Sequence, residues 1–171
     1  CHWIAAEDGT KLRVCNWIHA APRGTVFVFQ GRTEYIEKYG RIAQMLITYG
    51  WNVVAIDWRG QGYSERPEHD PMQGYVDHFA QYQQDIDALI HYAKSTDLPK
   101  PWNMLGHSMG GCIGLRALHR SGDEFDRVSF SAPMWGIEFG PLMNPFASTI
   151  AKISVYLGFA KSYVPSASSD C

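Results

Sequence analysis

The sequence Trp102-Asn103-Met104-Leu105-Gly106-His107-Ser108-Met109-Gly110-Gly111 joins a short apolar run to a helical pattern through a turn that holds a serine between glycines. Its centre fits G-x-S-x-G, in which the serine occupies a sharp turn between a strand and a helix. The backbone of such a turn is strained and leaves no room for larger neighbours, which explains the glycines. We therefore predict that Ser108 is a nucleophile. The alternative is an ordinary glycine-rich helix start with a capping serine.

The predicted helix start also offers groups that stabilise negative charge. Its free N–H groups and positive dipole end point toward the serine, so the backbone N–H of Met109 is a candidate oxyanion donor. In this arrangement a second donor comes from the loop after the first buried strand. That loop is Gln30-Gly31-Arg32-Thr33-Glu34, in which Gly31 allows close approach of the backbone and Arg32 supplies the N–H. The alternative is a strand-to-helix turn without a chemical role.

Strand and helix patterns alternate along the chain. An Asp-Gly turn within 7–10 predicts a hairpin over 2–20. Uninterrupted apolar runs, typical of strands buried on both faces, follow at 25–29, 52–56, 102–105 and 128–131. Amphipathic patterns between them predict helices over 35–49, 75–94 and 109–120. This order predicts an α/β fold, with a mostly parallel sheet, helices on both faces and an antiparallel hairpin at the N-terminal end.

The composition changes after Pro133. Residues 134–171 are rich in large apolar side chains and are interrupted by Gly140-Pro141 and Asn144-Pro145. We expect residues 1–133 to be the N-terminal part of the α/β core and residues 134–171 to be an apolar helical cap or lid. The alternative is a cap that packs on the core and has no role in ligand binding.

The bulk composition limits the classes of function. The chain has 171 residues, 46% of them hydrophobic, and a formal net charge of -2. This charge provides no basic surface for nucleic acid, and no apolar run has the roughly 20 residues that a membrane span needs. The four cysteines show no metal-ligand spacing, so we expect free thiols and no metal site.

Three motifs together resemble the monoacylglycerol lipases and bacterial lysophospholipases of the α/β-hydrolase fold, and most closely the lysophospholipase L2-like proteins. They are Phe29-Gln30-Gly31-Arg32-Thr33-Glu34, Asp57-Trp58-Arg59-Gly60-Gln61-Gly62-Tyr63-Ser64 and Gly106-His107-Ser108-Met109-Gly110-Gly111. Gln30 stands where the lipases have a histidine. The resemblance implies that Gly31, Glu34, Lys38 and His107 line the substrate site near the leaving alcohol. Glu34 and Lys38 are one helical turn apart and could instead pair with each other. We prefer a structural role, as a hydrogen-bond acceptor, for Asp57.

A serine nucleophile needs a base, usually a histidine oriented by a carboxylate. The only histidine after Ser108 is His119, which lies eleven residues along the predicted helix, about 16 Å away. We therefore expect the acid and the histidine of the triad to lie after residue 171, on strands that this chain lacks. The run at 128–131 would then be an open sheet edge. The 171 residues alone are expected to be poorly soluble and nearly inactive.

These observations favour a serine hydrolase that cleaves carboxylic esters of lipid-like substrates, a lysophospholipid or a monoacylglycerol, through an acyl-enzyme intermediate. No metal or organic cofactor is needed. The expected partner is a small lipid or ester substrate, with transient membrane contact and a cytoplasmic location. The alternatives are another serine hydrolase, such as an aminopeptidase, thioesterase or short-chain esterase, and a scaffold that binds a ligand without catalysis.

Overall fold

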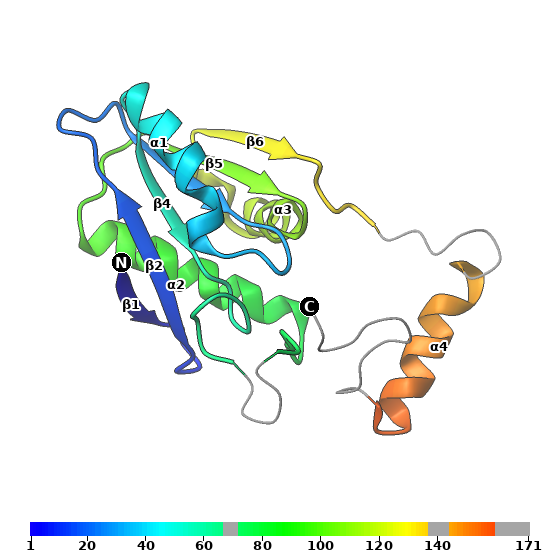
Figure 1. Ribbon diagram of the computed structural model, residues 1–171. Coiled ribbons are helices and arrows are strands. Elements are labelled where there is room, and N and C mark those ends of the chain that lie inside the picture. The colour runs from blue at the N-terminus through cyan, green and yellow to red at the C-terminus, as the bar shows by residue number, and fades with distance from the viewer. Residues whose placement is uncertain (67–71, 137–143, 160–171) are drawn as a thin grey trace. The chain divides into compact units, whose positions relative to one another are not determined.

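Two strands that are buried along their whole length form the centre of the sheet. They are β3 (Thr25–Phe29) and β4 (Asn52–Ile56). The computed structural model describes residues 1–66, 72–136 and 144–159. The other strands in this part of the chain are β1 (His2–Ala5), β2 (Lys11–Trp17), β5 (Trp102–His107) and β6 (Arg127–Ser131). All of them join one sheet in the order β1-β2-β4-β3-β5-β6 (Figure 1).

The sheet combines a parallel core with an antiparallel beginning. β4, β3, β5 and β6 run parallel to one another, whereas β1 pairs antiparallel with β2 and β2 antiparallel with β4. The prediction of a mostly parallel sheet with an N-terminal hairpin is therefore confirmed. Because β3, β4 and β5 are parallel, their carboxyl ends lie at one edge of the sheet, and this edge carries the three motifs.

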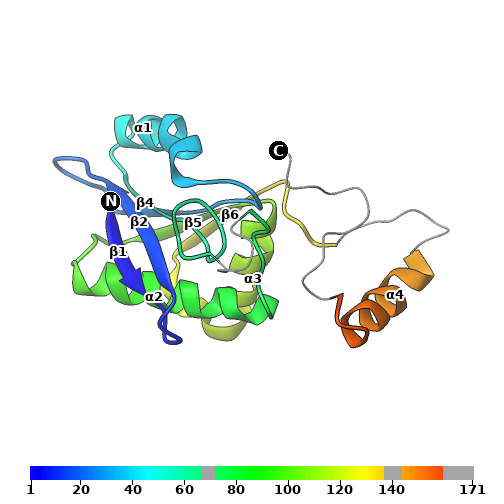
Figure 2. The same ribbon diagram turned by 60° about the horizontal axis from the view of Figure 1, so that its bottom comes forward.

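Helices cover both faces of the sheet, as predicted (Figures 1 and 2). The helix α1 (Gly40–Thr48) packs on one face against Val26, Val28 and their neighbours. The helices α2 (Tyr82–Ser95) and α3 (Met109–Ser121) pack on the other face, where the larger core cluster includes Phe27 and Phe29. Alternate residues of β3 thus contribute to the two clusters, as the two-residue period of a strand requires.

Two of the predicted helices begin later than expected. The turn η1 (Ile36–Tyr39) precedes α1, and the turn η2 (Phe79–Gln81) precedes α2, so residues 75–78 are not helical. The backbone at His78 is extended, and its N–H donates to Gln81 Oε1 at 3.0 Å. The amphipathic pattern continues through this segment, but the Gln81 side chain binds the His78 N–H, a cap typical of a helix start. The α-helix therefore begins only at Tyr82. The short turn η3 (Gly122–Glu124) follows α3.

The expectation of free thiols is wrong for two cysteines. Cys1 and Cys15 are joined by a disulfide, whereas Cys112 is free. The register of the hairpin places His2 opposite Val14, so Cys1 lies opposite Cys15. The hairpin therefore brings together two thiols that are far apart in the sequence.

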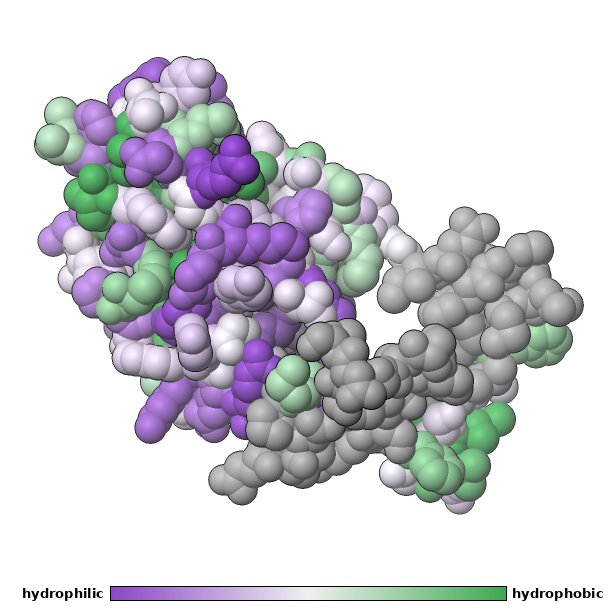
Figure 3. Space-filling view, viewed as in Figure 1, coloured by the Kyte–Doolittle hydropathy of each residue, from purple (hydrophilic) through white to green (hydrophobic). Residues whose placement is uncertain are grey.

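The chain divides into two compact units, Cys1–Met134 and Trp135–Cys171. The second unit contains α4 (Asn144–Tyr156), and hydrophobic side chains lie at its surface (Figure 3). Among them are Phe146, Ile153, Val155, Tyr156, Leu157 and Phe159. Residues 137–143 and 160–171, which the predicted cap includes, lie outside the described residues. The role of this unit as a cap stays a prediction.

None of the described helices has the length and the apolar character that crossing a membrane requires.

Candidate active site

Ser108 occupies a left-handed turn between β5 and α3. Its backbone angles are φ 49° and ψ −121°, a conformation that a residue with a side chain rarely adopts. The Ser108 N–H donates to the Ser131 carbonyl at 3.1 Å, and its own carbonyl accepts the N–H groups of Gly111 and Met134, both at 3.0 Å. The end of β6 and the residues after it therefore hold the serine in its strained turn.

The glycines around Ser108 are required by close packing. A Cβ atom on Gly110 would lie 2.2 Å from the carbonyl oxygen of Phe29, and one on Gly106 would lie 2.9 Å from the Cα atom of Gly111. In both cases the obstacle is backbone, which cannot rotate away as a side chain can. The glycines at both ends of the motif thus allow α3 to begin directly against β3 and β5.

The loop after β3 lies against the serine. A Cβ atom on Gly31 would be 3.1 Å from Ser108 Cβ. Within the described residues, neither the Met109 N–H nor the Arg32 N–H has a hydrogen-bond partner. Both predicted oxyanion donors are therefore available, one at the start of α3 and the other next to Gly31.

Backbone strain is concentrated around Ser108. Of the four non-glycine residues with positive φ in the described parts of the chain, Thr33, Ser108 and Ala132 follow β3, β5 and β6, and only Asp97 lies elsewhere. The Thr33 N–H donates to Gln61 Oε1 at 2.5 Å, which ties the β3 loop to the loop after β4. Strained backbone costs stability and tends to cluster at functional sites.

Glu34 is buried and anchors the β3 loop. Its Oε2 atom accepts the Gly31 N–H at 2.7 Å and the Tyr39 hydroxyl at 2.6 Å, and its Oε1 atom accepts Lys38 Nζ at 2.6 Å. Burial alone would raise the pKa of Glu34, but the hydrogen bonds from Lys38, Tyr39 and Gly31 lower it. Burial and the contact with Glu34 raise the pKa of Tyr39. The carboxylate is therefore ionised and the phenol protonated at neutral pH.

Asp57 is a buried acceptor for several neighbouring segments. Its Oδ1 atom accepts Gln30 Nε2 at 3.1 Å and the Ile36 N–H at 2.9 Å. Its Oδ2 atom accepts the Tyr63 N–H at 2.9 Å and Arg13 Nε at 2.8 Å. Asp57 thus joins the β3 loop, the loop after β4 and strand β2, which agrees with the preferred structural role. The sequence near Asp57 does not indicate Arg13, because no local pattern links residues 44 positions apart.

Among the described residues, the His107 ring has its hydrogen-bond contact with β6 and not with the β3 loop. His107 is half-buried at the end of β5, and its Nδ1 atom is 3.0 Å from the Ser131 carbonyl, toward β6. The structure joins Gly31, Glu34 and Lys38 by hydrogen bonds, but among the described contacts none links His107 to them.

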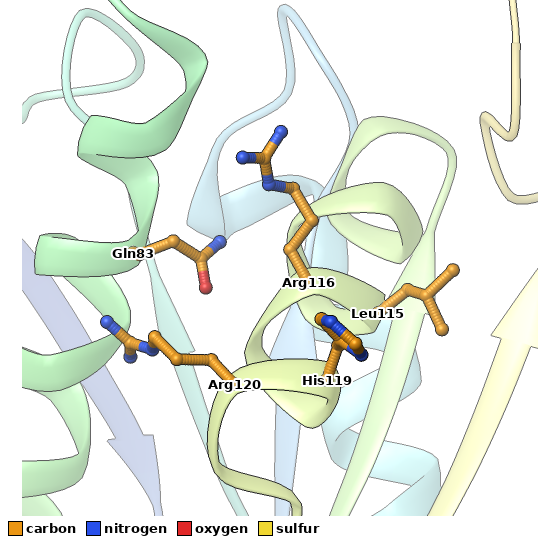
Figure 4. A pocket seen from close by; sticks show the side chains of 5 residues that line it. All are labelled: Gln83, Leu115, Arg116, His119 and Arg120. Carbon is orange, nitrogen blue, oxygen red and sulfur yellow. The ribbon is translucent and has the colours of Figure 1, made fainter.

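His119 lies in a separate hollow on the helical face. This hollow, about 600 Å³ in volume, lies between α2 and α3 (Figure 4). It is lined by Gln83, Leu115, Arg116, His119 and Arg120. No side chain of the described residues hydrogen-bonds the Ser108 hydroxyl. His119 lies in the last turn of α3, whereas Ser108 precedes its first turn, a separation of about 16 Å along the helix. His119 is therefore not the base for Ser108.

The comparisons with known proteins agree with this geometry. The family described as "Serine aminopeptidase, S33" matches residues 20–170. The chain belongs to this family. Its fold is the α/β-hydrolase fold, and the three motifs lie within the matched residues.

Curated relatives of this family member include lysophospholipases and lipases. Lysophospholipase L2 of Escherichia coli (strain K12) is 38% identical over 115 residues, which cover 66% of this chain and 33% of that protein. Probable lysophospholipase L2 of Haemophilus influenzae is 29% identical over 165 residues, 95% of this chain and 51% of that protein. The chain thus spans from about a third to half of the length of these relatives.

Solved structures share the fold at low identity. A monoglyceride lipase from Saccharomyces cerevisiae, in complex with a substrate analogue, aligns with a TM-score of 0.67 at 23% identity and covers 90% of this chain and 51% of that one. A carboxyl esterase from Bacillus coagulans aligns with a TM-score of 0.72 at 19% identity, over 92% of this chain and 50% of that one. These likenesses confirm the fold.

Proposed function

We propose that the protein is a serine hydrolase that cleaves the carboxylic ester of a lipid-like substrate, a lysophospholipid or a monoacylglycerol. The observation that carries this proposal is the strained Ser108 turn, with Gly31 against it and with N–H groups at Met109 and Arg32 that no other described residue pairs. Relatives named lysophospholipase and monoglyceride lipase support the substrate class.

The reaction proceeds in two steps. Ser108 Oγ attacks the ester carbonyl carbon and loses its proton to a base, while the N–H groups of Met109 and Arg32 stabilise the oxyanion. The bond to the alcohol then breaks, the alcohol takes the proton, and the acyl group stays on the serine. In the second step, water attacks the carbonyl carbon of the acyl-enzyme and loses its proton to the base. The bond to Ser108 Oγ then breaks, the serine takes the proton, and the acid is released. One oxyanion donor stabilises the transition state by about 3 kcal/mol.

Two parts of this mechanism lie outside the described geometry. We propose that the base is a histidine after residue 171, oriented by an acidic residue that also follows it. We also propose that residues 134–171 form a cap that binds the acyl chain, since α4 is rich in apolar side chains. His107 and Lys38 would lie near the leaving alcohol.

A substrate panel tests the proposal. The full-length protein is assayed with lysophospholipid, monoacylglycerol, acetate ester and aminoacyl amide substrates, alongside Ser108→Ala. We expect the long-chain esters to be preferred and Ser108→Ala to lose at least about 10³-fold in turnover. A preference for aminoacyl amides would favour the peptidase activity in the family description, and a preference for acetate esters would favour a short-chain esterase.

A further inference from the structure

The hydrogen bonds of Glu34 leave its carboxylate fully engaged by the protein. Gly31 N–H and Tyr39 Oη share Oε2, at 2.7 and 2.6 Å, and Lys38 Nζ occupies Oε1 at 2.6 Å. The residue as a whole is only 8% exposed. A carboxylate can accept more than three hydrogen bonds, but both oxygens of Glu34 already have partners. Oε2 accepts from Gly31 and Tyr39, and Oε1 accepts from the Lys38 ammonium. It is placed to hold the loop.

Gly31, whose N–H binds Glu34, lies directly beside Ser108. A Cβ atom on Gly31 would be 2.8 Å from Glu34 Oε2 and 3.1 Å from Ser108 Cβ, so the carboxylate and the serine both lie against the same side of Gly31. Since the Gly31 N–H is bound by Glu34, it is not available to an oxyanion. The next N–H along the loop, that of Arg32, has no partner among the described residues. The two neighbouring amides therefore have different roles. The Gly31 N–H binds Glu34 and holds the loop, and the Arg32 N–H is available for substrate.

We propose that Glu34 is a positioning residue, whose carboxylate binds the Gly31 N–H and thereby fixes the loop that presents the Arg32 N–H to the oxyanion. This inference rests on the proposed function. It assigns Glu34 a role different from the contact with the leaving alcohol that the sequence resemblance implied. The Tyr39 hydroxyl donates to the same oxygen, Glu34 Oε2, and therefore helps to position the carboxylate.

The two roles predict different kinetics. A residue that binds the alcohol acts only on substrates that have a polar alcohol, and its loss raises KM for them. A residue that positions an oxyanion donor acts in the transition state of every ester, so its loss lowers kcat without regard to the leaving group. A monoacylglycerol and a p-nitrophenyl ester of the same acyl length therefore distinguish the two roles.

The experiment compares Glu34→Met and Glu34→Gln with the unchanged full-length protein on both esters. Glu34→Met removes both acceptors, and we expect kcat to fall about 10-fold to 100-fold on both esters with KM little changed. Glu34→Gln keeps one oxygen for the Gly31 N–H, and it should recover most of that loss. Glu124→Gln is the matched control, because it breaks an ion pair with Lys94 at the far end of α2 and should leave both constants unchanged.

Tyr39→Phe is a second variant that keeps the acceptor for Gly31. It removes one donor from Oε2, and we expect a fall in kcat of less than about 10-fold on both esters. Thermal unfolding of each variant identifies loss of folded protein, and kcat is expressed per folded, titrated active site. A loss confined to the monoacylglycerol and to KM would overturn the inference, as would unchanged kcat in Glu34→Met. Absence of Ser108-dependent turnover in the unchanged protein would instead reject the proposed function.

Discussion

The loops that follow β4 and β5 lie at the same edge of the sheet and differ in what holds them. After β5, Ser108 keeps its turn because side chains are missing at Gly106 and Gly110, where any Cβ would meet backbone. After β4, the loop is held by groups that are present, since Asp57 is fully buried and accepts donors from several segments. Both loops should therefore be sensitive to added atoms, since a Cβ atom on Gly62 would lie 2.1 Å from Asp57 Cγ, but the loop after β4 should also be sensitive to lost charge.

Asp57→Asn should give the largest effect. The change removes the fully buried charge beside Arg13, whose guanidinium keeps only its pair with Glu37, and replaces an acceptor with a donor among the N–H groups that face it. Removal of one partner from a buried pair costs about 3–5 kcal/mol in the free energy of unfolding. Urea denaturation of the full-length protein measures this loss. A loss below about 1 kcal/mol would show that the charge does not hold this loop.

Gly110→Ala tests whether the loop after β5 depends on the absence of a side chain. The new methyl group would collide with the Phe29 carbonyl, so α3 must move away from β3. We expect a loss of about 1–3 kcal/mol in stability and at least a tenfold loss in turnover, because the serine moves with the helix. Gly122→Ala is the control, since no atom lies within 4 Å of its Cβ position and its φ is −63°. Equal effects at both glycines would contradict the steric explanation.

A smaller effect is expected at the turn of the hairpin, where Asp8 pairs with Arg59 of the β4 loop at 2.6 Å. Burial opposes ionisation of Asp8, but hydrogen bonds from Arg59 and Thr10 lower its pKa from 3.8 to about 2. Because the pKa is lower in the folded state, this pair stabilises the fold above pH 4, and its contribution is lost as the pH falls from 4 to 2. Asp8→Asn should therefore be less stable than the unchanged protein at pH 7, and most of this difference should be lost near pH 2. Urea midpoints at both values test this, and a difference of the same size at pH 2 as at pH 7 would contradict it.

Asp87→Asn should have the smallest effect and serves as a matched control for Asp57→Asn. Asp87 pairs with Arg120, but both side chains are largely exposed. Exposed ion pairs contribute less than about 1 kcal/mol and weaken as salt is added. Urea denaturation at low and high salt measures the change. A loss as large as that of Asp57→Asn would show that burial does not determine the effect.

The same comparison explains which features the sequence could predict. The turn at Ser108 was predictable because its steric limits act between neighbours in the sequence, and the buried strands were predictable from unbroken apolar runs. The contact of Asp57 with Arg13, by contrast, depends on how distant segments meet. Nothing near Asp57 in the sequence indicates its partner on β2.

The remaining differences arose where a local pattern was read without the fold. The amphipathic pattern over 75–94 predicted a longer helix than α2, because periodicity does not reveal the extended backbone at His78. The spacing of the cysteines does not predict the disulfide between Cys1 and Cys15, because their pairing follows from the hairpin register that places them opposite each other. The roles of Met109, Arg32 and His107 in binding stay predictions.

Chemical labelling of the serine tests the central claim most directly. A fluorophosphonate reacts only with a serine whose hydroxyl is activated and whose oxyanion is stabilised, and mass spectrometry locates the modified residue. In the full-length protein, we expect one adduct, on Ser108, formed more slowly in Glu34→Met and absent in Ser108→Ala. An unlabelled Ser108 in folded protein, or an adduct on another serine, would contradict the account.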